Sequence, residues 1–139
     1  MLEQWTHWKP IDGIAQIYNL ESITDGIPGL FIRLYEEKTK KRGLLISFEY
    51  SAEAYRITDE SFRRETLFAL GQQYGIPFFS EWALFKVTNS EYVQWLSRES
   101  SGITDSWNFI HFVFLTQDSM LEVVTTYEPK VTLWDLDRT

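Results

Sequence analysis

Cysteine is absent from this 139-residue sequence, and histidine occurs only twice. Without cysteine the chain can form neither a disulfide nor a zinc site built on thiolates. The two histidines, His7 and His111, match neither the HxH nor the HExxH spacing, and no acidic calcium-binding loop is found. The sequence therefore predicts no bound metal, and no cofactor is expected.

The glycine and serine motifs of common enzyme families are missing as well. The sequence contains no P-loop, no glycine fingerprint of dinucleotide-binding folds and no nucleophile elbow. The glycines of "DGIPG", residues 25–29, lead into a strand pattern and are interpreted as turn residues. Nothing in these motifs predicts a catalytic residue.

Long apolar runs are also lacking. The longest, around His111, is well short of the roughly 20 residues that a membrane-spanning helix needs. The N-terminal stretch "MLEQWTHWKPIDG" has neither the basic nor the apolar region of a targeting signal. We therefore expect a soluble, cytoplasmic protein without a membrane partner, which agrees with the absence of cysteine.

Basic residues are scarce: 13 Lys and Arg stand against 20 Asp and Glu, a net charge of −7. Residues 1–70 hold nine bases and eleven acids, a net of −2, and residues 71–139 hold four and nine, a net of −5. Nucleic acid is an unfavourable partner for such a chain, because phosphate binding requires clustered Lys and Arg. The one basic cluster, "KTKKR" at 38–42, is interpreted as the solvated tip of a hairpin.

Aromatic residues, in contrast, are abundant, at 17% of the chain, and 44% of all residues are hydrophobic. That composition excludes a disordered chain. The length suits one unit that buries its own core, and no linker or repeat divides it. We predict a single globular domain over residues 1–139.

Alternation along residues 29–37 predicts a half-buried strand, and residues 108–115, which have two apolar faces, are predicted to form a central strand. The predicted strands are residues 15–20, 29–37, 43–50, 82–87, 108–115 and 131–134.

Two helices are predicted. The first follows a cap at Thr58 or Asp59 and ends near Gly75, and the second begins with a capping box formed by Thr88 and Glu91. Residues 117–126 fit either a strand or a helix, and a short helix is favoured. The predicted fold class is α+β, a mostly antiparallel sheet with two or three helices packed on it.

His111 raises the question of catalysis, because it stands between Phe109 and Val113 on one face of the central strand. A catalytic histidine needs a nucleophile or substrate on one nitrogen and an orienting group on the other. No such partner stands at a recognisable spacing, so a hydrogen-bonded imidazole in the core is favoured over a hydrolase that uses His111 with a carboxylate. The acids near 49–60 are interpreted as capping and solubilising residues rather than a catalytic pair.

Three segments together resemble a group of small bacterial immunity proteins that are encoded beside polymorphic toxins. The segments are "EAYRITDES", "WALFKVTNSEYVQWLSRESSGI" and "IHFVFLTQDSMLEVVTTYEPKV", spaced over roughly residues 50–132. The resemblance implies a cytoplasmic protein that binds and neutralises a toxin domain and has no catalytic activity. A third alternative, from the residues alone, is a small-molecule binding module that uses the aromatic-rich sheet.

An acidic inhibitor would suit a basic toxin domain, and the acids of residues 87–129 outnumber the bases six to one. Asp118 and Glu122, four apart, are expected to share an exposed face. Asp105 and Trp107 lie in a loop before the central strand, where an aromatic anchor can sit inside a charged rim. Asp105, Trp107, Asp118 and Glu122 are therefore the predicted partner-binding residues, with a solvated acidic face as the alternative.

Overall fold

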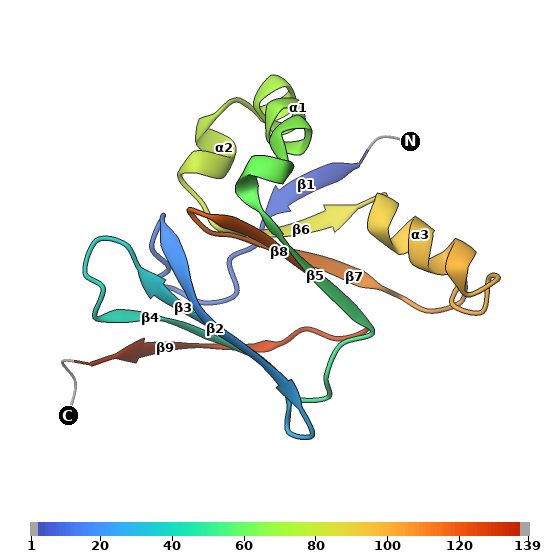
Figure 1. Ribbon diagram of the computed structural model, residues 1–139, viewed down its shortest axis with the longest axis horizontal. Coiled ribbons are helices and arrows are strands. Elements are labelled where there is room, and N and C mark those ends of the chain that lie inside the picture. Colours follow the sequence, from blue (N-terminus) through green and yellow to red (C-terminus); the bar gives the residue numbers. More distant parts are fainter. Residues whose placement is uncertain (1–2, 137–139) are drawn as a thin grey trace.

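A computed structural model gives the fold for residues 3–136; residues 1, 2 and 137–139, which the single-domain prediction includes, lie outside the described residues. The described part is α+β, as predicted, with nine strands in two antiparallel sheets and three α-helices (Figure 1). No helix within it is long and apolar enough to cross a membrane.

The larger sheet has five strands, and neighbours in space are often far apart in sequence. In spatial order its strands are β1 (Gln4–His7), β6 (Leu84–Thr88), β7 (Ile110–Leu115), β8 (Ser119–Thr125) and β5 (Ala54–Asp59). The prediction that 108–115 forms a central strand is confirmed, because β7 lies in the middle of this sheet.

The smaller sheet has four strands and begins as a meander. In spatial order they are β2 (Tyr18–Gly26), β3 (Gly29–Glu36), β4 (Arg42–Phe48) and β9 (Lys130–Asp135). The predicted hairpin with the basic tip is β3–β4, in which Leu34 pairs with Leu44. The sequence patterns did not indicate that the strands divide into two sheets.

The main core lies between the two sheets, where each contributes one apolar face. Alternation along the strands places every second side chain in this layer. Each fully buried large apolar side chain contributes about 2 kcal/mol from its removal from water. The principal members are Leu30, Ile32, Leu34, Leu44, Ile46, Phe48, Phe112, Phe114, Leu121 and Val123.

The other face of the five-stranded sheet is covered by two helices, α1 (Arg64–Tyr74) and α2 (Pro77–Ser80). They enclose a second core, in which Leu70 packs with Phe85 and Val113. The Tyr74 hydroxyl accepts a hydrogen bond from the Trp5 amide at 3.0 Å, which fixes α1 to β1. Both faces of β7 are therefore buried.

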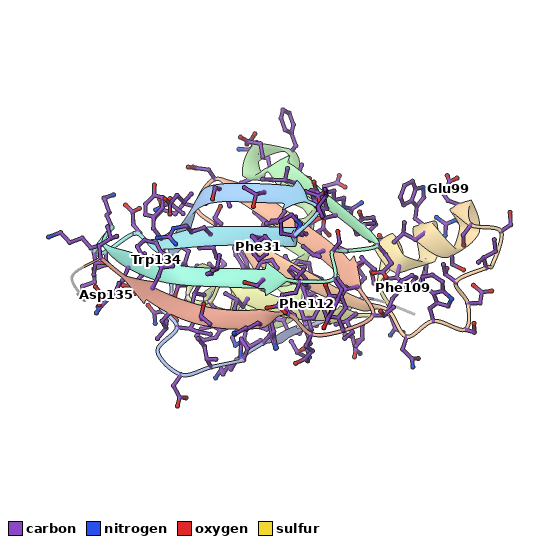
Figure 2. The ribbon with its side chains drawn as sticks, turned by 90° about the horizontal axis from the view of Figure 1, so that it is seen from below. Phe31, Glu99, Phe109, Phe112, Trp134 and Asp135 are labelled. Atoms are coloured by element: carbon purple, nitrogen blue, oxygen red, sulfur yellow. The ribbon has the colours of Figure 1, made fainter. Side chains whose placement is uncertain are left out.

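The third helix, α3 (Glu91–Glu99), stands at the end of the five-stranded sheet. In both views, the helix α3 and the loop that follows it extend beyond the two sheets (Figures 1 and 2). We call residues 91–109 the α3 arm. Tyr92 is the one fully buried residue of the helix, so the arm contacts the sheet mainly at its N-terminal end.

The structure corrects two local predictions. Residues 117–126 do not form a helix: 119–125 are strand β8. The helical spacing there was misleading, because both faces of β8 are buried and the strand shows no alternation. The capping box is also wrong: Ser90, not Thr88, caps α3 by accepting a hydrogen bond from the Val93 amide at 3.1 Å, while Thr88 ends β6.

The first α-helix also begins later in the chain than the cap predicted at Thr58 or Asp59 implies. Asp59 does accept a hydrogen bond from the Ser61 amide at 2.9 Å, but the turn that it caps is a short 3-10 helix, η1 (Glu60–Phe62). The α-helix α1 begins afterwards, at Arg64, without a side-chain cap.

The outer face of the four-stranded sheet is covered by its own side chains instead of a helix. Trp134 pairs with Gly43 across the ladder, and its indole nitrogen donates to the carbonyls of Leu34 and Leu44 at 3.1 and 3.3 Å. The Arg33 guanidinium stacks on the indole at 3.9 Å. A Cβ at position 43 would lie 1.8 Å from the Leu34 carbonyl oxygen, so glycine is required there.

Candidate functional site

The most concentrated group of charges in the fold surrounds Glu122, on the helix-covered face of the five-stranded sheet. Glu122 is 1% exposed and pairs in register with Arg56 of β5. Its carboxylate accepts hydrogen bonds from Arg56 at 2.5 and 3.1 Å and from the Arg63 guanidinium at 2.7 Å. The Arg63 side chain is 17% exposed and that of Arg56 45%, so one ion pair is largely buried and the other half-open.

His111 joins this group from the neighbouring strand. Its Nε2 lies 3.1 Å from Glu122 Oε1, and its Nδ1 lies 2.7 Å from the Ser90 hydroxyl. One donor pattern satisfies both contacts: the Ser90 hydroxyl donates to Nδ1, and Nε2–H donates to Glu122. Tyr92 packs edge-on against the His111 ring at 5.6 Å, and the Arg56 guanidinium lies 4.0 Å from the Tyr92 ring centre. We call Ser90, His111, Glu122, Arg56 and Arg63 the polar cluster.

Electrostatics of the cluster favour an ionised Glu122. Burial by itself raises the pKa of this carboxyl, but the hydrogen bonds from His111, Arg56 and Arg63 outweigh burial and hold the pKa well below its ordinary value. Burial likewise opposes the charge of Arg56, and the hydrogen bond to Glu122 reverses that effect, so the pKa of Arg56 is raised. Glu122 and Arg56 therefore each favour the charged form of the other.

The structure confirms that His111 is a buried, hydrogen-bonded residue, at 2% exposure. It also supplies the two partners that the sequence did not reveal. Ser90 precedes α3, and Glu122 is the single acid in the apolar stretch "MLEVV" of β8. That isolated acid in an apolar stretch is the signal that could have identified Glu122, since a buried carboxylate requires a partner.

The prediction of an exposed face shared by Asp118 and Glu122 is therefore wrong. Asp118 lies in the turn before β8 and is exposed, whereas Glu122 lies within the strand, beneath the helices. The four-residue spacing defines a common face only when both residues belong to one regular element. Glu122 is not available to a partner at the surface.

The structure places Asp105 and Trp107 on the α3 arm, away from Asp118. Asp118 follows the end of β7, and the arm precedes its beginning, so the six residues of that strand separate them by about 17 Å. Asp105 accepts a hydrogen bond from the Ser97 hydroxyl, which ties the loop back to α3. Trp107 is 47% exposed and packs against Phe109 with ring centres 5.6 Å apart.

Other large side chains are exposed on the same arm: Trp95 at 46% and Ile103 at 73%. The arm also holds three acids, Glu91, Glu99 and Asp105, and one base, Arg98, a net charge of −2. The arm thus combines exposed apolar side chains with an excess of acids. Trp95 and Ile103 were not among the predicted residues.

An apolar cleft is present at the far end of the sandwich from the arm. It has a volume of about 200 Å³, and its lining includes Tyr18, Leu67 and Trp82. This is smaller than the roughly 300–1,000 Å³ of typical small-molecule sites. The Tyr18 hydroxyl at its wall accepts a hydrogen bond from the Ala15 amide, and burial raises the pKa of Tyr18 to about 12.

Within residues 3–136 no group of three or more metal-ligating side chains is found. Searches with family models, among curated proteins and among solved structures gave no match to this chain.

Proposed function

We propose that this protein binds a toxin domain and neutralises it, as an immunity protein of the cytoplasm. The observation that carries the proposal is the α3 arm, an extension that exposes Trp95, Ile103 and Trp107 and has a net charge of −2. Exposed apolar side chains occur elsewhere on this surface as well, but the arm is the part of the described residues that carries two half-exposed tryptophans, which protein interfaces commonly use as anchors. The resemblance of the three segments to immunity proteins supports the same function.

The chemistry of the arm favours a basic partner. With three acids against one base, the arm attracts a positively charged surface and speeds its approach. Active sites that bind nucleic acid are basic, so a toxin that cleaves nucleic acid fits this description. The overall charge of −7 adds to the attraction.

The test is co-expression in bacteria of this protein with the toxin domain encoded by its neighbouring gene. We expect growth arrest by the toxin domain alone and growth when the wild-type protein is present. Failure of the wild-type protein to restore growth, with both proteins soluble and expressed, contradicts the proposal.

The arm is tested with purified proteins. Changing Trp95 and Trp107 to alanine should weaken binding by at least about tenfold, because interface tryptophans commonly carry 2 kcal/mol or more. Phe62→Ala and Phe68→Ala are matched controls, since those rings are 81% and 69% exposed but lie outside the arm. Equal affinity of the tryptophan variants and the wild type would place the interface elsewhere.

A second candidate function is hydrolysis, because Ser90, His111 and Glu122 form a hydroxyl–imidazole–carboxylate chain with contacts of 2.7 and 3.1 Å. Three features favour a structural role for this chain. Ser90 is 6% exposed, its oxygen also accepts the α3 capping bond, and Glu122 is neutralised by two arginines. Ser90→Ala separates the two functions: a hydrolase would lose its activity, and a binding protein that still folds would keep its affinity.

A further inference from the structure

Strand β5 is an edge strand with a free side. It is last in the five-stranded sheet and pairs with β8 in an unbroken register from Ala54–Val124 to Asp59–Ser119. Among the described residues no strand pairs with its other side. An open edge presents unpaired backbone N–H and C=O groups, and folded proteins usually protect it.

The other edges carry such protection. β2 has a register shift between Leu20 and Ser22, a bulge that interrupts pairing. β1 is four residues long, and β9 has Lys130 and Asp135 at its ends. β5 is regular over its six residues, and the charge of Arg56 is committed to Glu122, so its protection is limited to Asp59 at its end.

The hydrogen-bond pattern shows which residues of β5 face outward. The Glu60 amide donates to the Asp118 carbonyl at 2.9 Å, which continues the β5–β8 register by one step. In an antiparallel ladder the bonded pairs alternate, so even-numbered residues of β5 bond to β8. The backbone groups of Tyr55, Ile57 and Asp59 therefore point to the free edge.

The side chains along this edge are apolar and exposed. Ile57 is 48% exposed and Tyr55 38%, although both belong to a regular strand of the five-stranded sheet. The Tyr55 hydroxyl donates to Asp25 at 3.2 Å, a contact that leaves the backbone edge open. Exposed β-branched and aromatic residues on an unpaired edge are typical of strands that add another strand.

We propose that β5 pairs with β5 of a second copy of this chain, antiparallel and centred on Ile57. The edge is complementary to itself. A twofold axis at Ile57 places Ile57 against its own copy and Tyr55 opposite Asp59, and all three residues have their backbone groups directed outward. Three bonded pairs then form, each with two hydrogen bonds. No two like charges face each other in this register, since Arg56 lies opposite Thr58.

The dimer should be weak. A single six-residue strand buries less area than the 1,200–2,000 Å² of stable interfaces, and two acidic copies repel each other. We expect a monomer–dimer equilibrium that shifts toward the dimer at high protein concentration and at high salt.

Sedimentation velocity across a concentration series tests the oligomeric state. Ile57→Pro removes an amide that points outward, so the β5–β8 ladder is kept while the dimer is lost. Ile57→Lys places two positive charges at the axis and should also give a monomer. Leu133→Lys is the matched control, because Leu133 is 53% exposed on β9 and should leave the dimer intact.

Amide exchange supplies a readout specific to the register. As the concentration rises, the amides of Tyr55, Ile57 and Asp59 should become protected, whereas those of Arg56 and Thr58 are protected throughout.

Several outcomes overturn the proposal: a monomeric wild type at every concentration, a dimer that persists in Ile57→Lys, or a dimer lost in Leu133→Lys. Should Ile57→Pro fail to fold, Ile57→Lys decides, because it changes only an exposed side chain. Binding of the toxin partner is a separate measurement, and neither result depends on the other.

Discussion

Replacing Glu122 by glutamine tests the central interaction of the polar cluster. The substitution keeps the volume and removes the charge that Arg56, Arg63 and His111 share. The half-exposed Arg56 pair contributes roughly 0.5–1 kcal/mol, because water screens it. The more buried Arg63 contact contributes about 1.5–3 kcal/mol, and the His111 contact about 1 kcal/mol. The expected loss of unfolding free energy is therefore about 3–5 kcal/mol, as for other buried ion pairs that lose one member.

The same residue predicts a dependence on pH. Because the folded-state pKa of Glu122 is lowered from its ordinary value of 4.5, its stabilising effect is fully present above about pH 4.5 and is lost as the pH falls below that value. Glu122→Gln should therefore lower stability at pH 7 and flatten the loss of stability on acidification.

Urea denaturation of both proteins at several pH values measures these effects. Glu128→Gln is the matched control, because Glu128 also pairs with a base, Lys86, but its side chain is 54% exposed. It should change stability by less than about 1 kcal/mol. A loss below 1 kcal/mol for Glu122→Gln at pH 7 would refute the assignment of the cluster as a stabilising network.

Two further substitutions test single contacts by the same denaturation assay. Ser90→Ala should cost about 1–3 kcal/mol, since it removes the cap of α3 and a partner of His111; Thr88→Ala is the control, and an equal loss for both would restore the capping box. Gly43→Ala should be strongly destabilising, because the new Cβ would collide with the Leu34 carbonyl; an unchanged midpoint would mean that the ladder can shift there.

Strands with a clear alternation were predicted well, and β7 was predicted as well, although both of its faces are apolar and buried. β3 places Leu30, Ile32 and Leu34 in the core while the residues between them are half-buried, so one face is distinct from the other. β8 shows the opposite case: residues 120–125 are all buried, and a strand covered on both faces has no period of two. Local pattern then cannot distinguish a strand from a buried helix.

β5 and β1 were missed for a different reason. β5 is largely exposed, and β1 has four residues, so neither contains enough buried positions to form a pattern. The division into two sheets depends on which strands pair, and that information is non-local. The polar cluster could not be predicted for the same reason, because it also depends on non-local pairing. Its residues come together only after β5, β7, β8 and the start of α3 have assembled.

The pairing of distant strands has a consequence for how the chain folds. β1 pairs with β6, joining Trp5 to Val87, and β4 pairs with β9, joining Leu44 to Leu133. Forming such contacts closes long loops, and the entropy of loop closure is lost before the contacts stabilise the fold. We therefore expect folding in milliseconds to seconds rather than microseconds. During synthesis, β4 cannot complete its pairing until β9, the last strand of the described residues, has been made. Until then the sandwich has an unpaired edge beside its core, and in this interval the nascent chain is most exposed to aggregation and to chaperones.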